Sequence, residues 1–188
     1  MTALTPANQL TLLRMLLIPA FVILVLYGYL GWALIVFATA GVTDGLDGLI
    51  ARRSGQKTQL GAWLDPMADK LLLMTTFILL TLPGLELSNR LPVWLTVLII
   101  TRDVGIVLTV TIVNFAIGPR TFQPSMFGKI ATATYIVTAV VAMLFNYLRT
   151  HSVLFDVMVY ASLAITLISG FHYIWHAARI IDESRASA

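Results

Sequence analysis

The sequence predicts an all-α polytopic membrane protein, with six transmembrane helices in a bundle and both chain termini in the cytoplasm. Of its 188 residues, 59% are hydrophobic and only 11% are charged, whereas soluble domains average about 45–50% apolar and about 25% charged residues. The mean hydropathy is +0.89. The apolar residues form runs long enough to cross a bilayer, which takes about 20 residues each. We therefore expect one membrane domain over residues 1–188.

Six helices account for the apolar runs, and most of them end at residues that favour turns. Residues 15–43 carry no charge and are too long for one span. We divide them at Tyr27-Gly28-Tyr29-Leu30-Gly31-Trp32, a stretch that combines turn residues with interfacial aromatic side chains. Asn8 is the expected N-cap of the first helix. Pro83-Gly84 ends the third helix and Gly118-Pro119 ends the fourth. The expected helices cover about residues 9–28, 31–53, 60–82, 91–117, 125–148 and 153–178.

The basic residues predict the orientation, because cytoplasmic loops of membrane proteins carry an excess of Lys and Arg. The turns after the second and fourth helices and the C-terminal tail hold Arg52, Arg53, Lys57, Arg120, Lys129, Arg179 and Arg185. The opposite turns hold only Arg90 and Arg149, so both termini are expected in the cytoplasm.

Scattered basic residues give no basis for nucleic-acid binding, and the absence of cysteine excludes disulfides and thiol catalysis.

Four aspartates, Asp44, Asp47, Asp65 and Asp69, lie within 26 positions of one another. The first two are spaced i, i+3 near the cytoplasmic end of the second helix, and the last two i, i+4 near the start of the third, so each pair shares one helix face. The short connection makes the helices antiparallel neighbours, and the pairs can converge at one depth. A carboxylate at the membrane centre costs about 2.5–3.5 kcal/mol on insertion scales, so a counter-charge is expected. The alternative is solvated charge at two helix ends.

Oxygen ligands without Cys or His suit hard cations such as Mg²⁺ or Mn²⁺. Four carboxylates can hold two such ions about 3.5–4 Å apart, a pair that stabilises both oxygens of a phosphoryl displacement. Gly48 lets a ligand approach the backbone, and Arg52 can bind a phosphate in a fork, although helix packing and topological anchoring are their alternative roles. The segment predicts metal-assisted phosphoryl transfer at the cytoplasmic surface.

Residues 44–69 read D-G-L-D-G-L-I-A-R-R-S-G-Q-K-T-Q-L-G-A-W-L-D-P-M-A-D. This segment resembles the signature of the CDP-alcohol phosphotransferase family, D-x2-D-G-x2-A-R-x8-G-x3-D-x3-D, and every fixed position matches. The resemblance implies transfer of a substituted phosphate from a CDP-linked donor, here CDP-diacylglycerol, to an alcohol with release of CMP. It also implies a homodimer, and we expect a bacterial plasma membrane as the location.

The resemblance also implies roles for individual residues. Asp44, Asp47 and Asp65 would be metal ligands, and Asp69 would bind the second ion and act as general base on the acceptor hydroxyl. Three positions match those that contact the CDP part of the donor: Gly48, Arg52 and Thr58. The segment from Asn8 to Thr11, followed by Arg14, is similar to the family's P-N-x-L-T-x2-R segment, which helps hold the donor, although Ala7 stands where proline is usual.

Three cationic residues of the later helices are the candidates for binding the acceptor: Arg102, Arg120 and Lys129. Such a cluster favours a phosphate-bearing acceptor. The segment Gly128-Lys129-x2-Thr132 is similar to phosphatidylglycerolphosphate synthases, which take glycerol 3-phosphate and which we favour. Arg102-Asp103 and Pro124-Ser125 resemble CMP-forming cardiolipin synthases, which take phosphatidylglycerol. An internal ion pair at Arg102-Asp103 and topological anchoring by the other two are the alternatives.

Two other kinds of protein also use aspartates in membrane helices. A cation transporter would use them as a transport site, and an aromatic prenyltransferase carries two aspartate-rich segments. A transporter predicts acidic residues near the midplane or along a pore rather than gathered beside Arg52, and prenyltransferases resemble a longer chain with different aspartate spacing. We therefore favour a phosphatidyltransferase.

Overall fold

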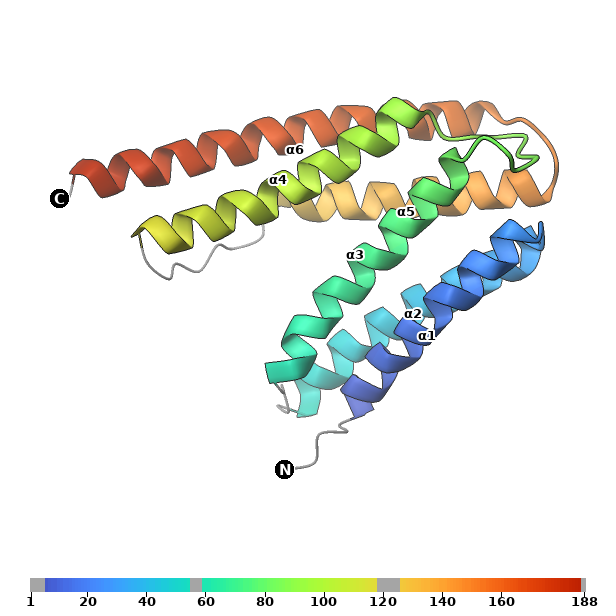
Figure 1. Cartoon of the computed structure of the whole chain (residues 1–188), viewed down its shortest axis with the longest axis horizontal. Coiled ribbons are helices and arrows are strands. Elements are labelled where there is room, and N and C mark those ends of the chain that lie inside the picture. Colours follow the sequence, from blue (N-terminus) through green and yellow to red (C-terminus); the bar gives the residue numbers. More distant parts are fainter. Residues whose placement is uncertain (1–5, 55–58, 118–125, 187–188) are drawn as a thin grey trace. The chain divides into compact units, whose positions relative to one another are not determined.

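The computed structural model describes the main chain of residues 6–54, 59–117 and 126–186, and the side chains of residues 9–43, 68, 70–109, 111, 126–175 and 179. Within these ranges the regular structure consists of six α-helices (Figure 1). They are α1 (Pro6–Leu26), α2 (Leu30–Ser54), α3 (Gln59–Thr81), α4 (Val93–Ile117), α5 (Met126–Tyr147) and α6 (Val153–Ala186). The prediction of six helices in this order is confirmed.

The chain divides into two compact units. Unit 1 contains residues 1–90 and 139–152, and therefore α1, α2, α3 and the C-terminal part of α5. Unit 2 contains residues 91–138 and 153–188, and therefore α4, the N-terminal part of α5 and α6.

Most helix ends lie within a few residues of the predicted ones. The prediction of Asn8 as an N-cap is wrong, because α1 already begins at Pro6. Proline suits the first helical position, where its fixed φ matches the helix and its missing N–H has no partner to lose. Asn8 therefore lies in the first turn of α1. At the other end of the chain, α6 continues to Ala186, beyond the predicted end near residue 178.

Two helices end with the same hydrogen-bonded turn. After α1, the Tyr29 N–H donates to the Leu24 carbonyl at 2.8 Å and the Gly28 N–H donates to the Val25 carbonyl at 3.0 Å. This pairing is a Schellman motif, which needs a residue with positive φ, and Gly28 provides it with φ 78°. After α5 the motif recurs, but its left-handed residue is Arg149, with φ 52°. A side chain at this conformation is strained, at about 1–2 kcal/mol.

A buried pair of asparagines joins the loop after α3 to the C-terminal end of α5 in unit 1. The Asn146 side chain accepts a hydrogen bond from the Asn89 N–H at 2.7 Å and donates to the Asn89 carbonyl at 2.9 Å. The Asn89 side chain donates to the Thr150 carbonyl at 2.7 Å. These bonds satisfy main-chain groups that would otherwise be buried without partners, and they hold the segment after α3 against the turn after α5.

The helices carry large apolar side chains on their outer faces. Three of them are long and apolar enough to cross a membrane within the described ranges, over Gln9–Leu26, Met126–Tyr147 and Val153–Trp175. Shorter apolar stretches cover Leu30–Thr43 and Lys70–Thr81. Exposed side chains such as Leu16, Phe171 and Trp175 would be unfavourable in water but suit lipid. The apolar helices indicate an integral membrane protein.

Unit 2 has a buried face on α6 with the spacing of a helix-packing seam. Phe155, Val159, Ser162, Thr166 and Ser169 are all buried, and they alternate at intervals of four and three residues. This spacing keeps them on one side of the helix. The last three are small and polar, a type that allows close helix approach and interhelical hydrogen bonds inside membranes. The seam places polar groups in the interior of unit 2.

Candidate active site

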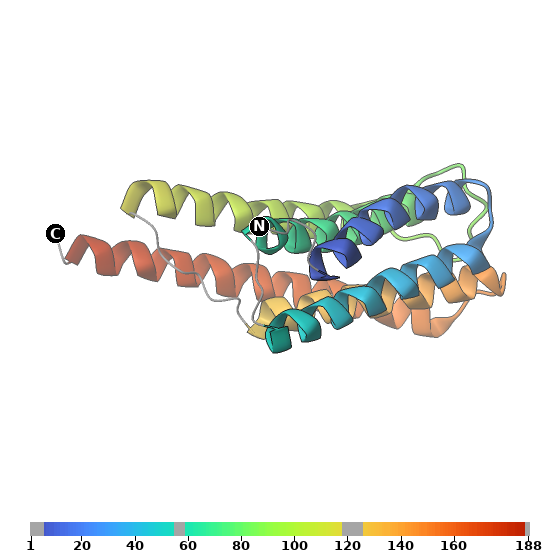
Figure 2. The same ribbon diagram turned by 90° about the horizontal axis from the view of Figure 1, so that it is seen from below.

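In unit 1, one end of each of α1, α2 and α3 lies near the segments of α2 and α3 that carry the four aspartates. α1 contacts both α2 and α3, and α2 contacts α3. The N-terminal end of α1, the C-terminal end of α2 and the N-terminal end of α3 lie together at one end of this unit, as two perpendicular views agree (Figures 1 and 2). The antiparallel arrangement of α2 and α3 expected from their short connection is therefore present.

The four aspartates lie on these converging helix ends. Asp44 and Asp47 belong to the C-terminal half of α2, and Asp65 and Asp69 to the N-terminal half of α3. Their side chains lie outside the described part of the chain, as do those of Asn8 and Arg52 and the whole of Thr58 and Arg120. Gly48 lies in α2, one residue after Asp47. The backbone thus brings both carboxylate-bearing segments to one end of unit 1.

α1 contributes two buried polar side chains to the same unit. Thr11 and Arg14 are one helical turn apart and are both fully buried. A buried guanidinium is strongly disfavoured unless negative groups and hydrogen bonds compensate its charge. Because α1 contacts both carboxylate-bearing helices, it presents a cation in the interior of the unit that carries the four aspartates. The predicted donor-binding residue Thr11 is therefore an interior residue of this unit.

The donor set on α2 and α3 suits a hard divalent cation. Its candidate ligands are four carboxylates on two helices in contact, and the chain has no cysteine. Oxygen-only coordination is what Mg²⁺ and Mn²⁺ prefer. Among the side chains that the structure describes, no group of three acidic, histidine or cysteine residues offers another metal site. The residues present therefore fit Mg²⁺ or Mn²⁺ at the end of unit 1.

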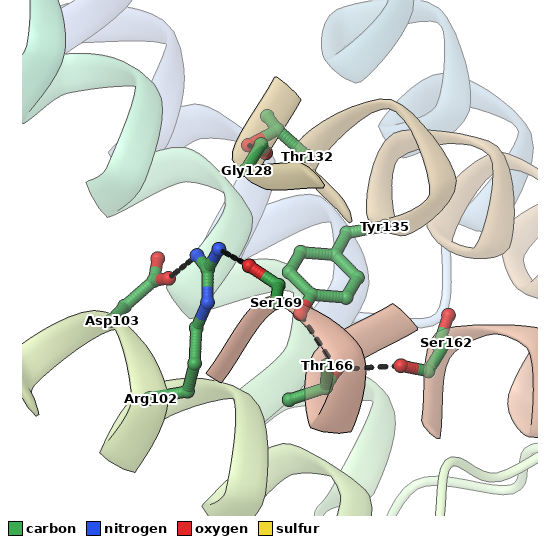
Figure 3. Close-up of polar contacts among 8 residues, drawn as sticks. All are labelled: Arg102, Asp103, Gly128, Thr132, Tyr135, Ser162, Thr166 and Ser169. Carbon is green, nitrogen blue, oxygen red and sulfur yellow. Dashed lines mark hydrogen bonds and ion pairs between the residues drawn. The ribbon is translucent and has the colours of Figure 1, made fainter. Parts of the chain in front are cut away.

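Unit 2 holds a second polar cluster, built around Arg102 (Figure 3). Arg102 lies well inside α4, and its side chain is only 10% exposed. Its Nη1 donates to the Asp103 carboxylate at 2.6 Å, and its Nη2 donates to the Ser169 hydroxyl on α6. The internal ion pair considered for Arg102 is thus present. Arg102 links α4 to the polar seam of α6.

Two further hydrogen bonds continue this polar layer between α5 and α6. The Tyr135 hydroxyl and Thr166 Oγ1 are 2.6 Å apart, and the Thr138 hydroxyl and Ser162 Oγ are 2.8 Å apart. All four side chains are buried. Thr166 also donates to the Ser162 carbonyl of its own helix at 2.5 Å. Hydroxyl pairs of this kind tie two membrane helices together without a net charge.

The remaining predicted acceptor residue in the described ranges is Lys129. It lies in the first turn of α5 and is exposed. Thr132, the last residue of the Gly128-Lys129-x2-Thr132 segment, donates its hydroxyl to the Gly128 carbonyl at 3.1 Å. This bond holds the hydroxyl against the helix backbone. Arg102 and Lys129 both belong to unit 2, on α4 and α5 respectively.

Comparison with known proteins places this architecture in a family. The model of the CDP-alcohol phosphatidyltransferase family matches residues 4–168, which include the α1 polar residues, all four aspartates, Arg102 and Asp103. The chain belongs to the CDP-alcohol phosphatidyltransferase family. It is therefore an enzyme of phospholipid biosynthesis rather than a cation transporter. CDP-alcohol phosphatidyltransferases generally depend on a divalent metal, in agreement with the donor set.

Individual relatives of this CDP-alcohol phosphatidyltransferase come from two branches. A probable phosphatidylglycerophosphate synthase of Mycobacterium tuberculosis is 37% identical over 191 aligned residues, covering 97% of this chain and 86% of the relative. A CMP-forming cardiolipin synthase of Streptomyces coelicolor is 39% identical over 135 residues, covering 69% of this chain and 60% of the relative. The human CMP-forming cardiolipin synthase is 35% identical over 76% of this chain and 52% of its own length.

Sequence reasoning missed two residues that the structure places in the polar interior of unit 2. Tyr135 and Ser169 belong to the layer around Arg102, whereas Arg14, which the sequence placed in a donor-holding segment, is buried in unit 1 with Thr11. The spacing of Ser162, Thr166 and Ser169 on α6 could have revealed a polar helix face. Which cation or hydroxyl that face meets depends on helix pairing, which the spacing does not specify.

Proposed function

We propose that this phosphatidyltransferase transfers the phosphatidyl group of CDP-diacylglycerol to glycerol 3-phosphate and releases CMP. The observation that carries this proposal is the similarity to a probable phosphatidylglycerophosphate synthase, which extends over 97% of the chain. The motif of Gly128, Lys129 and Thr132 at the start of α5 supports the same acceptor. Residues 1–188 would act as one functional domain, since α5 runs through both units.

The donor would be held at the shared end of α1, α2 and α3. Asp44, Asp47 and Asp65 would hold the metal ions together with Asp69, and Arg52 would pair with a donor phosphate in a bidentate fork. Gly48 lets the nucleotide approach the α2 backbone. Asn8 and Thr11 on α1, and Thr58, would complete the contacts with the CDP part. Two bound Mg²⁺ or Mn²⁺ ions would neutralise the diphosphate and make CMP a better leaving group.

Asp69 would act as the general base. The acceptor hydroxyl loses its proton to the Asp69 carboxylate as its oxygen attacks the phosphorus that carries diacylglycerol. A new oxygen–phosphorus bond forms, and the bond from that phosphorus to the oxygen of CMP breaks. CMP departs with the electron pair, and the product is a phosphodiester lipid. Arg52 is suited to stabilise the negative charge on the departing phosphate.

The acceptor would be recognised through its phosphate by Arg102, Arg120 and Lys129. Arg102 supports this role because only two of its five N–H donors are used in the hydrogen bonds of the polar cluster. Lys129 is exposed in the first turn of α5 and can act as a mobile point charge. Removal of either cation is expected to weaken acceptor binding more than donor binding.

A CMP-forming cardiolipin synthase is the second candidate. Relatives with this name are 35–39% identical to the chain, and the Arg102-Asp103 pair resembles that branch. It would use phosphatidylglycerol as acceptor at the same site.

The active site would face the cytoplasm of a bacterium, as the distribution of basic residues suggests, and the enzyme would be a homodimer.

The experiment is CMP release by purified protein in lipid–detergent micelles containing CDP-diacylglycerol and Mg²⁺. Glycerol 3-phosphate, phosphatidylglycerol, inositol phosphate and serine are tested as acceptors in separate reactions, with the Asp69→Asn variant as the inactive control. Release with glycerol 3-phosphate supports the proposal, and release with phosphatidylglycerol alone favours the second candidate. Release with neither acceptor by folded, metal-loaded enzyme would overturn both.

A further inference from the structure

The guanidinium of Arg102 is held at two of its three nitrogens. Nη1 bonds the Asp103 carboxylate and Nη2 bonds the Ser169 hydroxyl (Figure 3). With a single hydrogen bond, the planar guanidinium could rotate about that bond. Two hydrogen bonds at different nitrogens fix its plane. Asp103 is the next residue on α4, so its bond does not connect the guanidinium to another helix. The bond to Ser169 does, and it therefore sets the direction of the guanidinium relative to α6.

The third nitrogen of this guanidinium is buried and unsatisfied. Within the described residues, Arg102 Nε has no hydrogen-bond partner, although the side chain is nine-tenths buried. A buried N–H without a partner is unfavourable, and a charged donor is worse. The group that suits a fixed, partly used guanidinium is an oxyanion, which accepts two hydrogen bonds from its fork. The Nε–H therefore marks a place for a phosphate oxygen.

Ser169 differs from the other small polar residues of the α6 seam. Ser162 bonds Thr138, and Thr166 bonds Tyr135, so both hydroxyls pair α6 with neutral partners on α5. Ser169 instead bonds the cation on α4. All three are equally buried, at 0–1% exposure. The hydroxyls of Ser162 and Thr166 therefore only join α6 to α5, whereas the hydroxyl of Ser169 orients a charged group.

We propose that Ser169 is a positioning residue for acceptor binding, which holds Arg102 so that its Nε–H can bind the phosphate of the acceptor. This inference rests on the proposed function. Ser169 touches neither substrate, and its effect passes through the orientation of Arg102. Loss of its hydroxyl leaves the cation in place but lets the guanidinium turn away from the phosphate.

The test is a comparison of three variants in the CMP-release assay, using whichever phosphate-bearing acceptor the wild-type enzyme accepts. Ser169→Ala is expected to raise the KM for the acceptor about tenfold, the effect of losing one hydrogen bond to a charged group, with the KM for CDP-diacylglycerol unchanged. Ser169→Thr keeps the hydroxyl and should restore the acceptor KM. Ser162→Ala is the matched control, because it removes an equally buried hydroxyl from the same face without touching Arg102.

Each result decides the question. A selective rise in the acceptor KM for Ser169→Ala, restored by threonine and absent in Ser162→Ala, supports the inference. An unchanged acceptor KM, equal changes for both substrates, or the same change in Ser162→Ala would overturn it and leave the proposed function intact. If the wild-type enzyme releases no CMP with any phosphate-bearing acceptor, the proposed function fails and the inference fails with it.

Discussion

The side-chain amide of Asn146 bonds both main-chain polar groups of Asn89, accepting from its N–H at 2.7 Å and donating to its carbonyl at 2.9 Å. The Asn146 amide thus satisfies both main-chain groups of Asn89, as a paired strand does for a residue in a β-sheet. Both residues are almost completely buried, at 1–2% exposure. The pair joins segments 57 positions apart in the chain and closes the end of unit 1 opposite the carboxylates.

Replacing Asn146 with alanine should strongly destabilise the protein. The change leaves the Asn89 N–H and carbonyl buried without partners, and each such group costs about 1–3 kcal/mol. We expect a lower midpoint of thermal unfolding in detergent, with the KM values for both substrates unchanged. Thr150→Ala is the control, because Thr150 enters the network only through its main-chain carbonyl. Equal stability of the Asn146→Ala variant and wild type would contradict this account of the pair.

Replacing Arg149 with glycine should stabilise the protein. Arg149 occupies the left-handed position of the turn after α5 with φ 52°, and glycine adopts this conformation without steric cost. The expected gain in unfolding free energy is about 1 kcal/mol, measured by thermal or denaturant unfolding in micelles. Arg149→Ala separates the two effects of the change, because it removes the charge and keeps the strained conformation. If alanine stabilises as much as glycine, charge rather than backbone strain is the cause.

The same reasoning gives the opposite sign at Gly28. Its φ of 78° is unfavourable for any residue with a Cβ, so Gly28→Ala should lower the unfolding free energy by about 1 kcal/mol. Among the described residues other than its two chain neighbours, no atom lies within 4 Å of the Cβ position, so the substitution tests the backbone conformation. A stability equal to wild type would show that the turn can relax to another conformation.

Substitution of Asp69 by asparagine should abolish turnover, because the amide cannot accept the proton of the acceptor hydroxyl at neutral pH. The fold should persist, which circular dichroism and gel-filtration behaviour in detergent can check. CMP release below about one-thousandth of wild type is expected. Activity close to wild type in this variant would rule out Asp69 as the base.

Removal of divalent metal should reversibly stop the reaction. The four aspartates are the candidate ligands, and bound metal would also offset their mutual repulsion. A chelator is expected to abolish CMP release and to lower the thermal midpoint, and added Mg²⁺ or Mn²⁺ should restore both. An Asp44→Asn variant should need more Mg²⁺ for half-maximal activity. Full activity in excess chelator would contradict the metal assignment.

The sequence by itself determined the helices, the family and the candidate chemistry. Apolar runs of bilayer length, broken by Gly28, Pro83-Gly84 and Gly118-Pro119, set the number and approximate ends of the helices. The aspartate spacing on two neighbouring helices predicted metal-assisted phosphoryl transfer, and the resemblance of residues 44–69 to a family signature supplied the reaction class. These features are local, because helix periodicity and turn preferences depend on residues a few positions apart.

The tertiary structure decided which distant residues meet. Nothing in the spacing of α6 shows that Ser169 bonds Arg102 while Ser162 bonds Thr138, or that Asn146 bonds the main chain of Asn89. The first helix also begins earlier than expected, at Pro6, whereas Asn8 was the expected N-cap. Contacts between helices depend on their pairing, rotation and depth, and hydropathy constrains these only weakly inside a membrane because most faces of each helix are apolar. The polar interior of each unit is therefore a property of the folded chain.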